Sequence, residues 1–264
     1  MGYPEYEAVK AGPRRAVSQN MALAKTKWPQ AKPHAYTACD IDISALERVR
    51  AAQKELFREK HGVSLRMDLF FMLGLLDAVR AAPILNSCYE VSEKDGKLQE
   101  QIRQYRSMNL GIAIAHPRQL MTVAILEAEK KSFVELAQLL DVIYNLPRVE
   151  DPRKILAAHP ELELGTSTIT FNNAGGLGPA AEYGYSIIEP GASVILTIHR
   201  SRNVVTWREV EGCPVFVPSR LVCTSVSFDH RPFDGREAVK PLDDVKKRIE
   251  DPAWSSEVFH WSLV

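Results

Sequence analysis

A histidine near the end of the chain stands where it could remove a proton from a bound substrate. His230 follows an alternating apolar stretch, residues 221–228, and precedes the break at Asp234-Gly235. Such alternation predicts a largely buried strand, and a strand end holds a side chain on a rigid support. A neutral imidazole can accept the proton of a hydroxyl or thiol nucleophile. Taken alone, a histidine in such a turn is more often structural or solvated, so the rest of the chain must decide.

The elements that would support His230 indicate a mixed α/β chain. We expect helices over 14–27, 45–60, 68–81, 132–145 and 236–250. We expect strands near 35–43, 84–91, 109–115 and 120–126, and mainly strands between 167 and 228. Ser44 with Glu47 three residues later predicts a capping box at the start of the second helix. Such a mixture suits an α/β sandwich, with helices against a sheet face.

Composition favours one domain over residues 1–264, because 264 residues that are 45% hydrophobic can bury a substantial core. Lys+Arg and Asp+Glu both total 33, so nothing indicates a nucleic-acid or membrane partner. No apolar run reaches the length of a membrane span, and the first residues lack a signal peptide's pattern, which favours a cytoplasmic protein. Four scattered cysteines without a C-x-x-C pair disfavour a metal site: Cys39, Cys88, Cys213 and Cys223.

Residues 229–235 read D-H-R-P-F-D-G and resemble the D-H-R-x-x-D-G signature of dihydrolipoyl acyltransferase catalytic domains from 2-oxoacid dehydrogenase complexes. Other segments resemble that family in the same order along the chain: 12–17, 33–36, 109–114, 127–132, 168–175 and 186–190. The resemblance therefore covers nearly the whole sequence, from Gly12 to Pro252. It implies a two-layer sandwich like that of chloramphenicol acetyltransferase, with a mixed sheet, helices on one face, and trimers with active sites between subunits.

The resemblance also implies a reaction, the transfer of an acyl group between the thiols of dihydrolipoamide and coenzyme A. His230 would be the general base, and Asp234 matches the family's acidic position. The family pairs this acid with an arginine, for which Arg14 is the candidate; alternatively, or in addition, Asp234 caps the following helix. The resemblance gives four residues a supporting role in the site: Arg14, Arg15, Arg231 and Gly235.

The chain departs from the family at the group that would stabilise the oxyanion. The family's serine is replaced by Asn172, whose amide can also donate a hydrogen bond. Thr170 should lie on the same strand face and is a second candidate. Alternatively, Asn172 only caps a turn before Gly175. Residues 119–124 lack the family's Gly and Pro, which leaves the preferred acyl group open.

The expected partners follow from the same resemblance. We expect a homotrimer, which can assemble into a larger cubic or dodecahedral core with 2-oxoacid dehydrogenase and dihydrolipoamide dehydrogenase components or a lipoyl carrier protein. Coenzyme A would be a substrate, and lipoamide would arrive on a separate carrier domain, because the sequence contains no lipoyl or subunit-binding domain. Two other hypotheses stay open: an acyltransferase with a different acceptor, and a non-catalytic scaffold core of the same fold.

Overall fold

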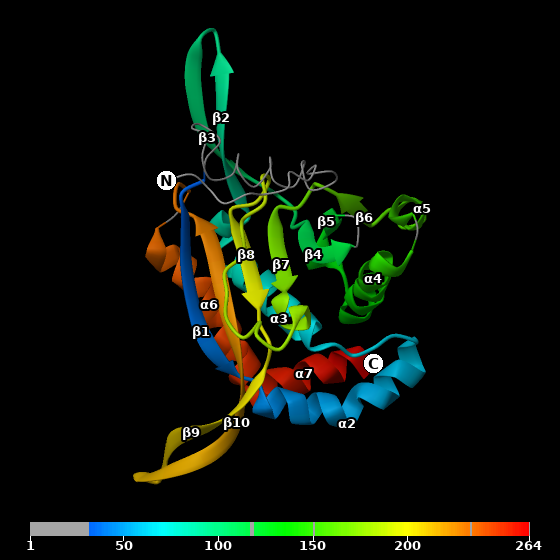
Figure 1. The fold of residues 1–264 in the computed structure, drawn as a ribbon, viewed down its shortest axis with the longest axis vertical. Helices are drawn as coiled ribbons and strands as arrows, with labels where there is room; N and C mark the ends of the chain where they lie inside the picture. The colour runs from blue at the N-terminus through cyan, green and yellow to red at the C-terminus, as the bar shows by residue number, and fades with distance from the viewer. Residues whose placement is uncertain (1–31, 117–118, 150, 233, 264) are drawn as a thin grey trace, which may run out of the picture.

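A computed structural model describes residues 32–116, 119–149, 151–232 and 234–263 of the chain (Figure 1). Its strands are β1 His34–Asp42, β2 Ser87–Lys94, β3 Lys97–Gln104, β4 Leu110–His116, β5 Gln119–Ile125, β6 Leu162–Leu164, β7 Ile169–Asn173, β8 Val194–Ile198, β9 Arg202–Val210 and β10 Cys213–Asp229. Its α-helices are α2 Ser44–His61, α3 Met67–Ala81, α4 Phe133–Asn145, α5 Pro152–Ala157, α6 Gly235–Glu250 and α7 Pro252–Leu263. Short 3₁₀ turns include η1 Pro83–Leu85 and η4 Ala174–Leu177.

Within the described residues, the main sheet has eight strands in the order β1-β10-β8-β7-β4-β5-β6, and β9 pairs with the outer part of β10. The pairs β4–β7 and β7–β8 are parallel, whereas the other neighbours are antiparallel. Helices α3, α4 and α6 lie behind this sheet in Figure 1. The expected two-layer sandwich, a mixed sheet with helices on one face, is therefore confirmed.

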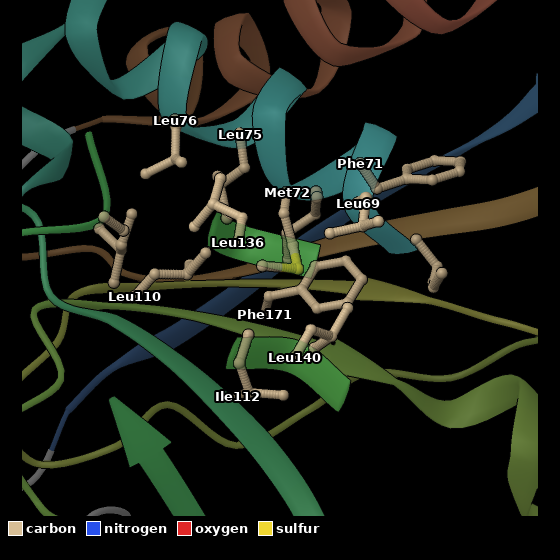
Figure 2. Packing of buried hydrophobic residues seen from close by; sticks show 14 of the residues in the cluster. Leu69, Phe71, Met72, Leu75, Leu76, Leu110, Ile112, Leu136, Leu140 and Phe171 are labelled. Atoms are coloured by element: carbon tan, nitrogen blue, oxygen red, sulfur yellow. The ribbon is translucent and has the colours of Figure 1, made fainter. Parts of the chain in front are cut away.

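The hydrophobic core lies between the helices and that face of the sheet. Figure 2 shows Leu69, Met72 and Leu75 of α3 directed toward Leu110 and Phe171 of the strands. These five side chains are fully buried, and complete burial of a side chain of this size stabilises the fold by about 2–3 kcal/mol. The helix expected over 68–81 is apolar nearly all round because it packs against the sheet and also against α6 and α4 beside it in the helix layer.

The other face of the sheet is small and polar at its centre. On β10, Ser225 and Ser227 alternate with core residues and are buried, with exposed fractions of 0% and 1%. Ser225 pairs with Thr197 of β8, which in turn pairs with Asn172 of β7. In the same way, Ser227 pairs with Ile195, which pairs with Thr170. The two candidate oxyanion donors therefore belong to this hydroxyl-rich face.

Two hairpins extend away from the body of the protein (Figure 1). One is β2–β3, which turns at Asp95-Gly96, where both residues have positive φ. The other is formed by β9 and the outer part of β10. Among the described residues, no helix has the length and apolar character needed to cross a bilayer.

Two local expectations change, and a third falls outside the described residues. The capping box of Ser44 and Glu47 is wrong: Ser44 is the first helical residue, and its hydroxyl instead accepts the backbone N–H of Arg220 at 2.8 Å. The strand expected near 84–91 begins only at Ser87, because residues 83–85 form a 3₁₀ turn that Pro83 opens. The helix expected over 14–27, with Arg14 and Arg15, lies outside the described residues.

Candidate functional site

His230 lies immediately beyond the end of β10 and is exposed. Its backbone N–H donates to the carbonyl oxygen of Pro33, just before β1, at 3.0 Å. Its ring lies 5.5 Å from the ring of Phe228, measured between centroids. The backbone of His230 is therefore tied to the neighbouring strand while its imidazole remains accessible, as a general base requires.

A buried ion pair flanks His230 on both sides in the sequence. The Asp229 carboxylate has no exposed surface and accepts from the Arg231 guanidinium at 2.7 and 3.0 Å. The Arg231 guanidinium also stacks over the ring of Tyr89, 4.7 Å from its centroid. Removing one partner of a buried pair typically costs about 3–5 kcal/mol, so both neighbours of His230 are held firmly. Sequence reasoning named Arg231 as support but missed Asp229, although both stand in the same motif.

Asp234 caps helix α6. Its carboxylate accepts the backbone N–H groups of Arg236 at 2.9 Å and Glu237 at 3.2 Å, and the Glu237 carboxylate accepts the N–H of Asp234 at 3.0 Å. This reciprocal capping box confirms the alternative given to Asp234. The proposed partner Arg14 lies outside the described residues. At Gly235, the first helical residue, an added Cβ would meet no atom within 4 Å.

Asn172 and Thr170 lie on the same face of β7, as strand alternation predicts. The Asn172 amide donates to the Ser186 hydroxyl at 2.9 Å, and that hydroxyl lies 2.7 Å from the hydroxyl of Thr197. The Thr170 hydroxyl is fully buried and makes no hydrogen bond within the described part of the chain. Because an amide carries two N–H groups, Asn172 keeps one that can be offered to an oxyanion.

The alternative role of Asn172 as a turn cap is wrong, because its neighbour performs it. The Asn173 side chain accepts the backbone N–H of Gly175 at 2.9 Å and caps the short turn η4. An added Cβ at Gly175 would meet the backbone of residues 199 and 200 at 3.0 Å, so this close approach favours glycine.

A single chain does not bring His230 and Asn172 together. Asn172 pairs with Thr197, which pairs with Ser225 on β10, so Asn172 is level with Ser225 and two strands away from it. Ser225 comes five residues before His230 in the sequence. At the usual rise and spacing of strands, the two residues lie about 20 Å apart. The candidate base and the candidate oxyanion donor therefore stand at different places along the sheet.

Beside Asn173, the ends of the parallel strands β7 and β8 open on a cavity of about 360 Å³. Its lining includes Asn173, His199 and Arg200. The His199 imidazole is buried, and its Nδ1 lies 3.0 Å from the carbonyl oxygen of Cys223. Burial lowers the pKa of this ring, so it is neutral near pH 7. Sequence reasoning missed His199; its only signal was a second histidine directly after a buried strand.

The other polar groups of this cavity are largely paired. Asp68, at the start of α3, accepts from the Tyr144 hydroxyl at 2.6 Å and from the Asn173 amide at 2.9 Å. Glu47 forms an ion pair with the Arg220 guanidinium, with 3.0 Å between Nε and Oε2. Within the described residues, no group of three or more His, Cys, Asp or Glu side chains is arranged to hold a metal ion. The cavity therefore offers neutral and paired donors.

Comparison with known proteins identifies the family of this chain. Residues 4–255 match the family model described as the catalytic domain of 2-oxoacid dehydrogenase acyltransferases. The chain belongs to this family. The expectation drawn from the D-H-R-x-x-D-G segment is thereby confirmed, and the Asp229–Arg231 pair and His230 are features of an acyltransferase catalytic domain.

Among curated relatives of this acyltransferase domain, the human succinyltransferase component of the 2-oxoglutarate dehydrogenase complex is 29% identical over 215 residues, which is 81% of this chain and 43% of that protein. The acetyltransferase component of the acetoin cleaving system of Bacillus subtilis is 30% identical over 212 residues, 80% of this chain and 48% of that protein. The chain thus spans about half the length of these relatives.

Solved structures of acyltransferase cores share the fold. A probable dihydrolipoamide acetyltransferase from Listeria monocytogenes has a TM-score of 0.74 at 26% identity and covers 93% of this chain and 94% of its own. The dihydrolipoamide acetyltransferase of Azotobacter vinelandii also has a TM-score of 0.74, at 22% identity, covering 94% of this chain and 93% of its own. The expected fold therefore agrees with that of solved cores over nearly the whole chain.

Proposed function

We propose that this acyltransferase domain moves an acyl group between the thiols of dihydrolipoamide and coenzyme A, with His230 as the general base. The observation that carries the proposal is the placement of His230: an accessible imidazole on a backbone fixed by Pro33 and by the Asp229–Arg231 pair. That placement lies inside the motif that marks the family, whose described activity is acyl transfer.

The chemistry needs a base and an oxyanion donor. A thiol with a pKa of about 8.5 is only a few per cent ionised at neutral pH, so a positioned imidazole accelerates its attack. The attacking sulfur adds to the thioester carbonyl, and the charge that develops on its oxygen needs hydrogen-bond donors. Asn172 and Thr170 supply these donors, and collapse of the tetrahedral species expels the other sulfur as a thiolate, which takes the proton from the imidazolium.

The distance between the candidate base and the candidate oxyanion donor supports a homotrimer with sites between subunits. About 20 Å separates His230 from Asn172 in one chain, so a second chain must complete the site. The hairpin β9–β10 supports such contacts, because Val205, Trp207 and Phe216 are each at least 60% exposed, and aromatic side chains are enriched at interfaces. Assembly of the trimers into a larger cubic or dodecahedral core is part of the same proposal.

Partners follow from the names of the relatives. The human relative is a component of a 2-oxoglutarate dehydrogenase complex, and we therefore propose 2-oxoacid dehydrogenase and dihydrolipoamide dehydrogenase components, or a lipoyl carrier protein, as partners. Coenzyme A would be a substrate, and lipoamide would be presented on a separate domain. The cytoplasmic location stays a prediction, because the relatives include both mitochondrial and bacterial proteins.

One observation keeps the scaffold hypothesis as a second candidate. The Asn172 amide, which stands where the family has a serine, already donates to Ser186. If that bond occupied the amide fully, the domain would assemble without catalysing. The presence or absence of turnover separates the two hypotheses.

The test measures acyl transfer from acetyl-, succinyl- and branched-chain acyl-CoA to dihydrolipoamide. We expect turnover with at least one donor, and a loss of about 10²–10⁴-fold in His230→Ala, because general-base catalysis contributes that much. His159→Ala, in a half-buried histidine of the loop before β6, is the matched control and should retain the wild-type rate. A wild type inactive with every donor, or a His230→Ala variant as active as the control, would contradict the proposal; amine and alcohol acceptors would then be screened.

A further inference from the structure

Residues 188–193, which lead into β8, direct several carbonyl groups at one buried ammonium. The side chain of Lys32 donates to the carbonyl oxygens of Glu189, of Pro190 at 2.8 Å and of Ala192 at 2.6 Å. Lys32 is only 6% exposed. A lysine is almost never buried to this extent unless it is paired, and here all three ammonium hydrogens have an acceptor.

The peptide around Lys32 also holds the candidate base. The carbonyl of Pro33 accepts the backbone N–H of His230, and the N–H of Asp229 donates to the carbonyl of Ser193 at 2.9 Å. Residues 188–193 thus contact β10 directly at one end and Lys32 at the other. The backbone N–H groups of Asp229 and of His230 itself are therefore both held by this cluster of contacts.

His34 closes the cluster. Its Nε2 accepts the backbone N–H of Ile188 at 3.0 Å, so its Nδ1 carries the hydrogen and donates to the carbonyl of Lys32 at 2.8 Å. The start of β1 is thereby fastened to residues 188–193 through both the side chain and the carbonyl of Lys32.

We propose that Lys32 is a positioning residue: its ammonium joins residues 188–193 to the start of β1 and so fixes the backbone from which His230 acts. The inference rests on the proposed function, in which His230 is the base. Lys32 itself contacts neither thiol, and it acts only through the carbonyl of Pro33 and the segment 188–193. A misplacement of about 1 Å can cost a large factor in rate, which gives a fixed backbone its value.

The charge of Lys32 depends on pH. Burial lowers the pKa of its ammonium from 10.5 to about 8, an effect that the facing groups Cys88, Asp229 and Glu189 oppose and Arg231 reinforces. The ammonium is therefore present at neutral pH and is lost as the pH rises through about 8. Loss of one hydrogen weakens the grip on the three carbonyls, so the rate should fall on the alkaline side.

The experiment compares Lys32→Met and Lys32→Ala with Lys130→Met, the control, whose exposed lysine pairs with Glu127 on the surface. With the donor and acceptor that the wild type turns over, we expect kcat to fall about tenfold or more in both Lys32 variants and to stay unchanged in the control. The alkaline decline near pH 8 should disappear in Lys32→Met. Added propylammonium should restore turnover in Lys32→Ala with saturation, because it can occupy the vacated carbonyl cluster.

Two outcomes would overturn the inference: a wild-type rate and pH profile in Lys32→Met, or a slow Lys32→Ala that propylammonium leaves unchanged. A wild type inactive with every donor would instead contradict the proposed function. In that case the pH dependence of the free energy of unfolding tests whether Lys32 is a buried ammonium, independently of activity. The folded protein releases this proton near pH 8 and the unfolded chain near 10.5. Between these values the unfolded state binds more protons, so wild-type stability should rise with pH relative to Lys32→Met. The absence of that rise would exclude a buried ammonium.

Discussion

The His230 end of the sheet and the Asn172 end are built in opposite ways. Around His230, the carboxylate of Asp229 is fully buried against Arg231, and backbone hydrogen bonds fix the base to the next strand. Around Asn172, the side-chain amide bonds to Ser186, and the next residue, Asn173, lines a cavity of about 360 Å³ together with the neutral ring of His199. One end thus fixes a reactive group, whereas the other end provides room and donors. Each end carries what the other lacks, and we infer that two chains together form a complete site.

The largest effect would come from combining chains with complementary defects. Co-expressed His230→Ala and Asn172→Ala subunits, isolated as mixed trimers with two affinity tags, should regain about a third of wild-type activity, since each mixed trimer has one intact site out of three. Each variant alone should remain far below this value. The measurement is the specific activity of the doubly tagged fraction.

The control for mixing is wild type with His230→Ala, which should give about half of the wild-type activity whichever chain supplies each residue. Activity of the doubly defective mixture no higher than the sum of its parents would contradict the two-chain site and place both residues in one protomer.

A smaller effect should come from changing the candidate oxyanion donors alone. Asn172→Ala should lower kcat about a hundredfold with little change in KM, because an oxyanion donor acts only in the transition state. Asn172→Ser, which restores the residue that the family carries, should retain most of the activity. Steady-state kinetics on both variants and on Thr170→Val would check this: a loss confined to Thr170→Val would transfer the role to that hydroxyl.

The smallest effect concerns the helix cap at Asp234, near His230. Asp234→Ala should lower the free energy of unfolding by about 1 kcal/mol, because α6 loses its N-cap. Asp234→Asn keeps an acceptor at the cap and should unfold near the wild-type urea concentration. If the Asn variant is stable yet slow, Asp234 acts in the site as well as in the cap; equal stability of Asp234→Ala and the wild type would exclude the cap's contribution.

Local patterns predicted elements better than they predicted contacts. The strands expected at 109–115 and within 221–228 lie in β4 and β10, because alternation follows directly from which face is buried. The pattern S-x-x-E stands at the start of two helices, at Ser44 and at Ser132, and forms a capping box only at Ser132, where Glu135 completes it. At Ser44 the hydroxyl is taken by Arg220, a residue 176 positions away. A distant partner can thus override a local signal.

The site could be predicted only in part for the same reason. His230 and Asn172 stand in recognisable segments, and residue type alone indicated their chemistry. The contacts of Lys32 with residues 188–193 join positions 157 to 160 apart, and no local pattern marks them. His199 becomes meaningful only once the cavity at the ends of β7 and β8 is known. Long-range packing decides these features, and a sequence window does not contain it.

The pairing of β1 with β10 also sets an order of events during synthesis. Ile41 pairs with Val222, which is made 181 residues later. At ribosomal rates of about 5–20 residues per second, β1 waits roughly 10–40 s for its partner. Throughout that time its apolar residues and hydrogen-bonding edge remain uncovered, a hazard for aggregation. Nascent chains of this domain should therefore depend on holding chaperones until β10 has left the ribosome.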